Sequence, residues 1–212
     1  VQGLVTPYNI GISDRSGLTK LFLSSFMWDG GSSCHSIGEE VGFDLKPRPS
    51  PFAQGTAAFS LDDFIKQSSE SEATVPNAIK LDVDGFEHLV IRGSIDTLTN
   101  PEVKTLCIEV NYNLVEHRDM IKQLESLGFY CCEEQVERSV RREGPFKGCA
   151  EVILDRIQKN EIIAINGFSP QKSTYHDGSV ADSAFADVIS KIERSAAERY
   201  PFPAVYISDL FP

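Results

Sequence analysis

Residues 78–87 read Ala-Ile-Lys-Leu-Asp-Val-Asp-Gly-Phe-Glu, and this stretch decides how the rest of the chain is interpreted. Apolar side chains occupy alternate positions, and the stretch ends in three carboxylates, Asp82, Asp84 and Glu87, with a glycine among them. This pattern predicts a buried strand that stops at a polar edge of its sheet. Because open α/β sheets bind ligands at the carboxyl ends of their strands, the three acids are expected at a functional site.

The spacing of Asp82 and Asp84 is compatible with several kinds of chemistry. Two carboxylates at this spacing can share a divalent cation if a turn brings them together, as in a glycosyltransferase site for a nucleotide sugar. An Asp-x-Asp-Gly segment after a strand also occurs in phosphatases, but the further lysine and paired acids of that chemistry are not found downstream. The spacing excludes an EF-hand. The alternative without chemistry is that Asp84 caps the following helix and that Glu87 favours its N-terminus.

The composition is that of a globular domain with an acidic surface. The 212 residues carry a formal net charge of −11, whereas nucleic acids and anionic membranes bind basic surfaces, so neither is expected as a partner. The five cysteines are odd in number and two of them are adjacent, which favours reduced thiols and therefore the cytoplasm.

The segments before the central strand predict a hairpin, a long loop and a short helix. Pro7–Ser13 and Leu18–Ser24 are the two expected strands of the hairpin, joined by a turn. Residues 25–55 lose periodicity and are rich in glycine and proline, so a long loop is expected there. A helix is expected at Ser60–Gln67, with Ser60 as its N-cap.

After the central strand, helix and strand patterns alternate. The expected elements are a helix at Gly85–Leu98, a strand at Val103–Val110, a helix at Glu116–Leu127 that Gly128 closes, and antiparallel strands at Phe129–Val136 and Ala150–Asp155. This order predicts an α/β fold with a mostly parallel sheet and an antiparallel C-terminal hairpin. Glu109 and Asn111 end the second strand and are therefore expected beside Asp82.

The chain divides by pattern near residue 155. Residues 1–155 are expected to form one domain. Residues 156–212 are expected to be a linker with an amphipathic helix at Ala181–Tyr200, a short strand at Val205–Ile207 and the possible start of a further domain.

Several motifs, in this order, resemble the FkbM family of S-adenosylmethionine-dependent methyltransferases. They are Asn9–Gly17, Ser60–Phe64, Ile79–Glu87, Val90–Gly93, Cys107–Val110 and Leu124–Phe129, and the resemblance covers about residues 5–155. It implies a class I, Rossmann-like methyltransferase fold, S-adenosylmethionine as cofactor, and O-methylation of a hydroxyl on a sugar or natural-product-like acceptor. The family's glycine-rich cofactor loop and its ribose-binding acid are expected upstream of Val1. The resemblance therefore covers the later part of the domain, and it implies a domain that is incomplete at its N-terminus.

The resemblance gives roles to the acids. Methyl transfer to a hydroxyl is an in-line displacement, helped by holding the acceptor near the sulfonium and removing its proton. Asp82 or Glu109 is the expected catalytic group, and His88 and His117 are alternative bases. No metal ligands are assigned, although a divalent ion on Asp82 and Asp84 would lower the pKa of the hydroxyl. Cofactor contacts are expected from Ser13, Asp14, Asp82 and Asp84, and acceptor contacts from Glu87, Asn111 and His35.

Two other possibilities stay open at this point. The first is the glycosyltransferase-like site for a metal and a nucleotide sugar at Asp82 and Asp84, and the second is a non-catalytic remnant of a methyltransferase. The C-terminal segment Tyr200–Pro212 weakly resembles the start of iron- and 2-oxoglutarate-dependent oxygenase domains, which suggests further domains in a longer parent chain.

Overall fold

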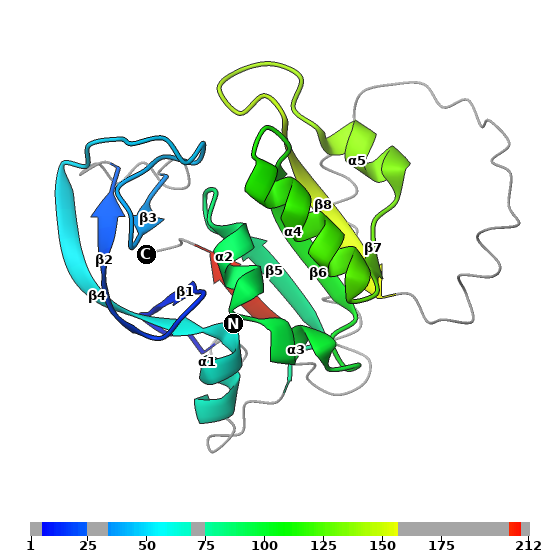
Figure 1. The fold of residues 1–212 in the computed structure, drawn as a ribbon, viewed down its shortest axis with the longest axis horizontal. Coiled ribbons are helices and arrows are strands. Elements are labelled where there is room, and N and C mark those ends of the chain that lie inside the picture. The colour runs from blue at the N-terminus through cyan, green and yellow to red at the C-terminus, as the bar shows by residue number, and fades with distance from the viewer. Residues whose placement is uncertain (1–5, 25–33, 69–74, 157–203, 209–212) are drawn as a thin grey trace, which may run out of the picture.

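The computed structural model describes residues 6–24, 34–68 and 75–156, and the backbone of 204–208. Within these residues the chain forms five helices and two β-sheets, one of four strands and one of five (Figure 1). The predicted helix at Ala181–Tyr200 lies outside the described residues, as does the C-terminal resemblance apart from residues 204–208. None of the described helices has the length and apolar character that crossing a membrane requires.

The larger sheet has the order β7-β8-β6-β5-β9. Its strands are β5 (Ala78–Asp82), β6 (Thr105–Asn111), β7 (Phe129–Tyr130), β8 (Cys149–Arg156) and β9 (Ala204–Ser208). Strand β5 runs parallel to both β6 and β9, whereas β8 runs antiparallel to both β6 and β7. The antiparallel C-terminal pairing is therefore confirmed, but the sheet is mixed and not mostly parallel. The sheet is mixed because the chain does not enter β8 from the same end of the sheet as β6, so the two strands run in opposite directions.

The central strand β5 is paired on both sides, so its carboxyl end lies inside the sheet. Its side chains alternate between two faces. Ile79 and Leu81 point toward helices α2 (Glu87–Arg92) and α3 (Ile95–Thr99), while Lys80 and Asp82 stand on the other face.

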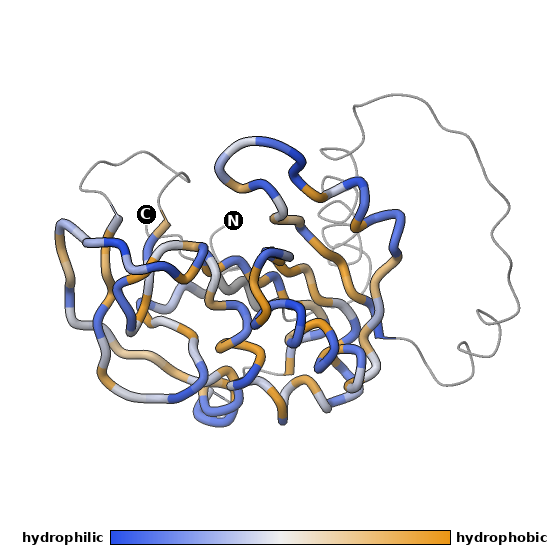
Figure 2. Tube along the Cα trace, turned by 45° about the horizontal axis from the view of Figure 1, so that its top comes forward, coloured by the Kyte–Doolittle hydropathy of each residue, from blue (hydrophilic) through white to orange (hydrophobic). Residues whose placement is uncertain are grey.

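Helices α2, α3 and α4 (Val115–Ser126) cover one face of this sheet (Figure 1). The core forms between them, and Figure 2 shows apolar positions along the strands and hydrophilic ones along the surrounding loops. Its fully buried side chains include Leu61, Leu81, Val90, Leu106, Ile108 and Leu154. At about 2 kcal/mol for each fully buried large aliphatic side chain, this core is the main source of stability.

The helix predicted at Gly85–Leu98 is broken into α2 and α3 at Gly93. A Cβ at Gly93 would lie 2.3 Å from the Ser13 carbonyl oxygen, so the backbone of another element approaches here. The Gly93 carbonyl accepts a hydrogen bond from the Asp62 N–H (3.1 Å), and the Asp62 carboxylate accepts one from the Thr97 N–H (2.7 Å). Tertiary partners thus take over the backbone groups that a continuous helix would pair.

The smaller sheet has the order β1-β4-β2-β3 and corrects the predicted hairpin. Its strands are β1 (Gly11–Ser13), β2 (Gly17–Leu23), β3 (Ser36–Ile37) and β4 (Phe52–Ser60). Strand β4 lies between β1 and β2, parallel to the first and antiparallel to the second. The loop predicted at 25–55 was wrong where β3 and the start of β4 stand. The first four residues of β4 are exposed, so no apolar alternation marks that part.

The helix predicted at Ser60–Gln67 is confirmed as α1 (Leu61–Ser68). The Asp63 N–H donates to Ser60 Oγ (3.1 Å), which is the expected N-cap bond. Gly128 follows α4 with a φ of +89°, as expected of a C-terminal glycine.

The strand predicted at Phe129–Val136 ends after two residues and is followed by helix α5 (Glu133–Ser139). The Gln135 side chain binds backbone groups of β8 that the short β7 leaves without a strand partner. Its amide N–H donates to the Glu151 carbonyl (2.8 Å) and its oxygen accepts from the Ile153 N–H (3.4 Å). This one side chain takes the place of a neighbouring strand along that edge of β8.

Candidate functional site

Three carboxylates converge where β5 and β6 end. Asp82 follows Leu81, which pairs with Ile108, so that Glu109 stands beside Asp82 on the neighbouring parallel strand. Asp82, Glu87 and Glu109 each bring an oxygen within 4.8 Å of the others. Three carboxylate oxygens at this separation can hold a divalent cation, an organic cation or the hydroxyls of a ligand. Asp84 is not a member of this group.

Asp82 is held by a lysine that sequence reasoning did not single out. Lys80 Nζ lies 3.2 Å from Asp82 Oδ2 and also contacts Glu151 Oε1 from β8. Burial lowers the pKa of Lys80, but the negative charges of Asp82 and Glu151 outweigh it and raise the pKa above its ordinary value. The ammonium is therefore charged. The sequence places Lys80 two residues before Asp82 on the same strand, which was a signal for this contact. The contact with Glu151 had no such signal, because Glu151 lies far away in the sequence.

Glu109 has a less ordinary environment. Its carboxylate lies 3.1 Å from the Arg141 guanidinium, which comes from the loop after α5. Burial and the charges of Asp82 and Asp84 raise the pKa of Glu109, and Arg141 opposes that rise. A carboxyl with a raised pKa is suited to accept a proton nearer to neutral pH.

Glu87 holds the turn that carries the other acids. Its side chain is 1% exposed and accepts hydrogen bonds from the backbone N–H groups of Val83 and Gly85, both 3.0 Å. Burial raises the pKa of Glu87 to about 8. Asp84 has a φ of +49° in this turn. Helix α2 begins after Phe86 and has no side-chain cap bond, so the interpretation of Asp84 as its cap is wrong.

His117 is buried and links β6 to the same turn through hydrogen bonds. The Asn111 N–H donates to His117 Nδ1 (3.0 Å), so Nε2 carries the ring proton and donates to the Gly85 carbonyl (3.0 Å). Burial lowers the pKa of His117 to about 4. Although Nε2 lies 3.3 Å from a Glu87 oxygen, the shifts in both pKa values disfavour an ion pair. His117 is thus placed as an internal hydrogen-bonding group. Burial also lowers the pKa of the half-buried His88.

Two loops meet above the acids. A Cβ at Gly85 would lie 2.7 Å from the Phe43 carbonyl oxygen, so the loop between β3 and β4 rests on the turn. The Phe43 ring lies 4.6 Å from that of Phe146, which also carries the Arg141 guanidinium at 5.4 Å. Cys34 lies near Asp84, and burial followed by that carboxylate raises the pKa of its thiol to about 11.

The other predicted site residues lie elsewhere. Asp14 is 3.8 Å from Arg92 and Ser13 is 3.4 Å from Asp14, so both stand at the far end of α2 from Glu87. Helix α2 has six residues and is therefore about 9 Å long. His35 Nδ1 accepts a hydrogen bond from the Ser24 N–H (3.1 Å) beside the smaller sheet.

Asn111 is buried and its side chain ties loops together. Its oxygen accepts from the Asn113 N–H (3.1 Å), and its amide donates to the Phe43 carbonyl (3.5 Å). The structure therefore gives Asn111 and Glu87 internal contacts, while Asp82 and Glu109 are more open to solvent.

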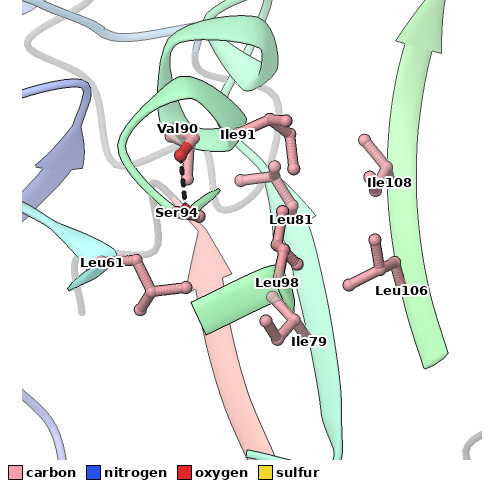
Figure 3. A pocket seen from close by; sticks show the side chains of 9 residues that line it. All are labelled: Leu61, Ile79, Leu81, Val90, Ile91, Ser94, Leu98, Leu106 and Ile108. Atoms are coloured by element: carbon pink, nitrogen blue, oxygen red, sulfur yellow. Dashed lines mark hydrogen bonds between the residues drawn. The ribbon is translucent and has the colours of Figure 1, made fainter. Parts of the chain in front are cut away.

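An apolar cavity of about 10 Å³ lies on the opposite face of β5, between α2 and α3 (Figure 3). Its single polar side chain, Ser94, donates to the Val90 carbonyl (2.5 Å). The volume has room for about one water molecule, and the cavity is a packing void of the core and not the site.

Comparison with protein families matches residues 7–131 to the family described as the Methyltransferase FkbM domain. No curated protein and no solved structure gave a match. The match includes β5, α2 and β6 and covers more than half of the chain, and it confirms the resemblance found in the motifs. The chain therefore belongs to the FkbM methyltransferase family.

Proposed function

We propose that this protein is an S-adenosylmethionine-dependent methyltransferase that methylates a hydroxyl on a sugar or natural-product-like acceptor. The observation that carries the proposal is the convergence of Asp82 and Glu109 at the carboxyl ends of adjacent parallel strands in an FkbM domain. In such sheets this end is where ligands bind.

The acids suit this cofactor chemically. S-adenosylmethionine carries a sulfonium, an ammonium and ribose hydroxyls, all of which are complemented by carboxylates. We propose that Asp82 and Asp84 hold it near the sulfonium, and that Ser13 and Asp14 contact its nucleoside end. When bound, the cofactor supplies an electrophilic methyl group.

The chain's own residues supply the proton chemistry. We propose that Glu109, whose pKa is raised, accepts the proton of the acceptor hydroxyl, and that Asp82 orients this hydroxyl. The rings of Phe43 and Phe146 contact each other, and we propose that the loops that carry them limit the access of water to this place. Acceptor contacts of Glu87, Asn111 and His35 stay predictions.

A second candidate is a site for a nucleotide sugar and a divalent metal. It is favoured by the mutual approach of Asp82, Glu87 and Glu109. Against it, Lys80 and Arg141 already form ion pairs with Asp82 and Glu109, and their positive charges would repel a metal cation. A non-catalytic remnant is the third candidate.

Titration calorimetry of the chain separates these functions. We expect heat of binding with S-adenosylmethionine, and none with UDP-glucose plus Mn²⁺. The reverse pattern would favour the glycosyltransferase-like site, and the absence of heat in both titrations would favour the remnant. Formation of S-adenosylhomocysteine in the presence of a panel of methyl hexopyranosides then tests the acceptor class.

We further propose a cytoplasmic enzyme that acts on small molecules, without nucleic acid or membrane partners. All five cysteines are free, which suits a reducing compartment. The division of the chain after residue 155 also stays a proposal. Strand β9, beyond that division, pairs with β5.

A further inference from the structure

Lys80 stands among the acids because of strand alternation. Lys80 and Asp82 are two positions apart on β5 and share a face of the sheet. Across β6, Glu109 lies directly opposite Glu151 of β8, on the same face. Lys80 pairs with Cys107 in register, so its long side chain passes over Cys107 to reach Glu151.

The ammonium is more enclosed than the acids that it binds. The side chain of Lys80 is 16% exposed, against 43% for Asp82 and 38% for Glu151. Two of its three N–H donors are directed at carboxylates from different strands. Charge-assisted bonds of this kind fix an orientation more firmly than exposed ion pairs do.

Without this cation, Asp82 would lose its ion-pair partner beside Glu109, which Arg141 binds separately. Like charges at this distance repel, so the ion pair with Lys80 favours an orientation of Asp82 that stays close to Glu109. The positively charged Lys80 ammonium lies between Glu151 and Asp82 and contacts Asp82 through Oδ2. The contact holds one oxygen and leaves the other for a ligand.

We infer that Lys80 is a positioning residue, anchored by Glu151, which holds the Asp82 carboxylate in the orientation that meets the acceptor hydroxyl. This inference rests on the proposed methyl-transfer function and adds to it a residue that touches neither cofactor nor acceptor. Glu151 acts through Lys80 in the same way.

Kinetics of the full chain test the role. The acceptor is the methyl hexopyranoside that the wild type methylates fastest. With Lys80→Met we expect kcat to fall about 100-fold, while the KM for this acceptor changes less than about threefold. Lys80→Arg, which keeps the charge, recovers at least about a tenth of the wild-type kcat, and Lys122→Met, at an exposed position of α4, has no effect. Equal kcat in Lys80→Met and wild type would overturn the inference.

Glu151→Gln covers the case in which Lys80→Met does not fold. Because Glu151 is partly exposed, this variant keeps its fold and lowers kcat about tenfold. A folded Glu151→Gln with unchanged kcat would count against the anchor and so against the inference.

Acetylation of the protein without cofactor gives a readout apart from activity. By mass spectrometry after treatment with acetic acid N-hydroxysuccinimide ester, Lys80 should react at least about tenfold more slowly than Lys122, which is 72% exposed. Glu151→Gln should speed the reaction of Lys80. Equal rates at Lys80 and Lys122 would contradict the contacts on which the inference stands.

Failure of the proposed function is distinguishable from failure of this inference. If the wild type neither binds S-adenosylmethionine nor methylates any member of the panel, the methyl-transfer function fails and the role of Lys80 in it fails too. If the wild type is active and the Lys80 and Glu151 variants match it, only the positioning role is overturned.

Discussion

At the scale of single residues, the fold uses ionisable groups for support as well as for chemistry. Glu87 and His117 are both 1% exposed and both bind the turn at Gly85. They fix the backbone from which Asp82 and Asp84 project. The acids of the central stretch thus divide into a buried support and a more exposed pair, a division that depends on packing.

Gly85→Ala should destabilise the protein by about 2–3 kcal/mol, since Gly85 has a φ of +104° and a Cβ would meet Phe43. Chemical denaturation measures the loss. Gly144→Ala, with a φ of +78° and open space around it, measures the cost of backbone strain without a steric contact. Gly55→Ala has neither a positive φ nor a close contact and serves as the baseline. If Gly85→Ala costs no more than Gly144→Ala, the contact with Phe43 is not close.

His117 should make stability depend on pH. Its folded pKa of about 4 lies below its ordinary value, so the unfolded chain takes up a proton first as pH falls. The stability that His117 contributes is therefore present at pH 7 and is lost, by about 3 kcal/mol, as pH falls from about 6.5 to about 4.

The measurement compares wild type with His117→Gln by denaturation between pH 7 and 4.5. Glu87, whose pKa is raised, acts in the opposite direction, because its protonated form favours the folded state as pH falls below about 8. Both proteins keep Glu87, so the difference between them reports His117 together with its contact to Glu87. A difference that stays constant with pH would show that His117 is not held neutral.

At the scale of elements, the break between α2 and α3 depends on Asp62 of α1. Its carboxylate accepts from the N–H groups of Asp96 (3.0 Å) and Thr97 (2.7 Å), at the start of α3. We expect Asp62→Ala to cost about 1–2 kcal/mol, as the loss of a helix cap does. Glu125→Ala, at an exposed position of α4, should change the unfolding free energy by no more than about 0.5 kcal/mol. Similar losses of stability in both variants would show that Asp62 does not stabilise the start of α3.

The sequence predicted elements where burial follows a regular period. Strand β5 and helix α4 carry such patterns, and β6 is nearly buried throughout, as its apolar run predicted. Strands β5 and β6 position Asp82 and Glu109. The half-exposed β4 and the short α5 carry weak patterns, because their partners and not their periodicity determine them. The contacts of Lys80 with Glu151 and of Arg141 with Glu109 join distant segments, and single-sequence periodicity holds no signal for them.

At the scale of the whole molecule, the two sheets meet over the acids through their loops. The contact between Phe43 and Phe146 joins a loop of the smaller sheet to one of the larger sheet. A double-mutant cycle with Phe43→Leu and Phe146→Leu should give a coupling of about 0.5–1.5 kcal/mol in unfolding free energy. A control cycle that pairs Phe43→Leu with Tyr130→Leu, at an exposed position of β7, should give a coupling near zero. Equal couplings would mean that the loops do not touch.

The central claim is that Asp82 and Glu109 form a site of methyl transfer at the ends of β5 and β6. The most direct measurement is the rate at which the chain forms S-adenosylhomocysteine with the methyl hexopyranosides, in wild type and in Glu109→Gln. We predict that Glu109→Gln lowers kcat by about 10²–10⁴-fold, because the proton acceptor is lost, while the exposed Glu125→Gln leaves it unchanged. An active wild type with an equally active Glu109→Gln would contradict the claim.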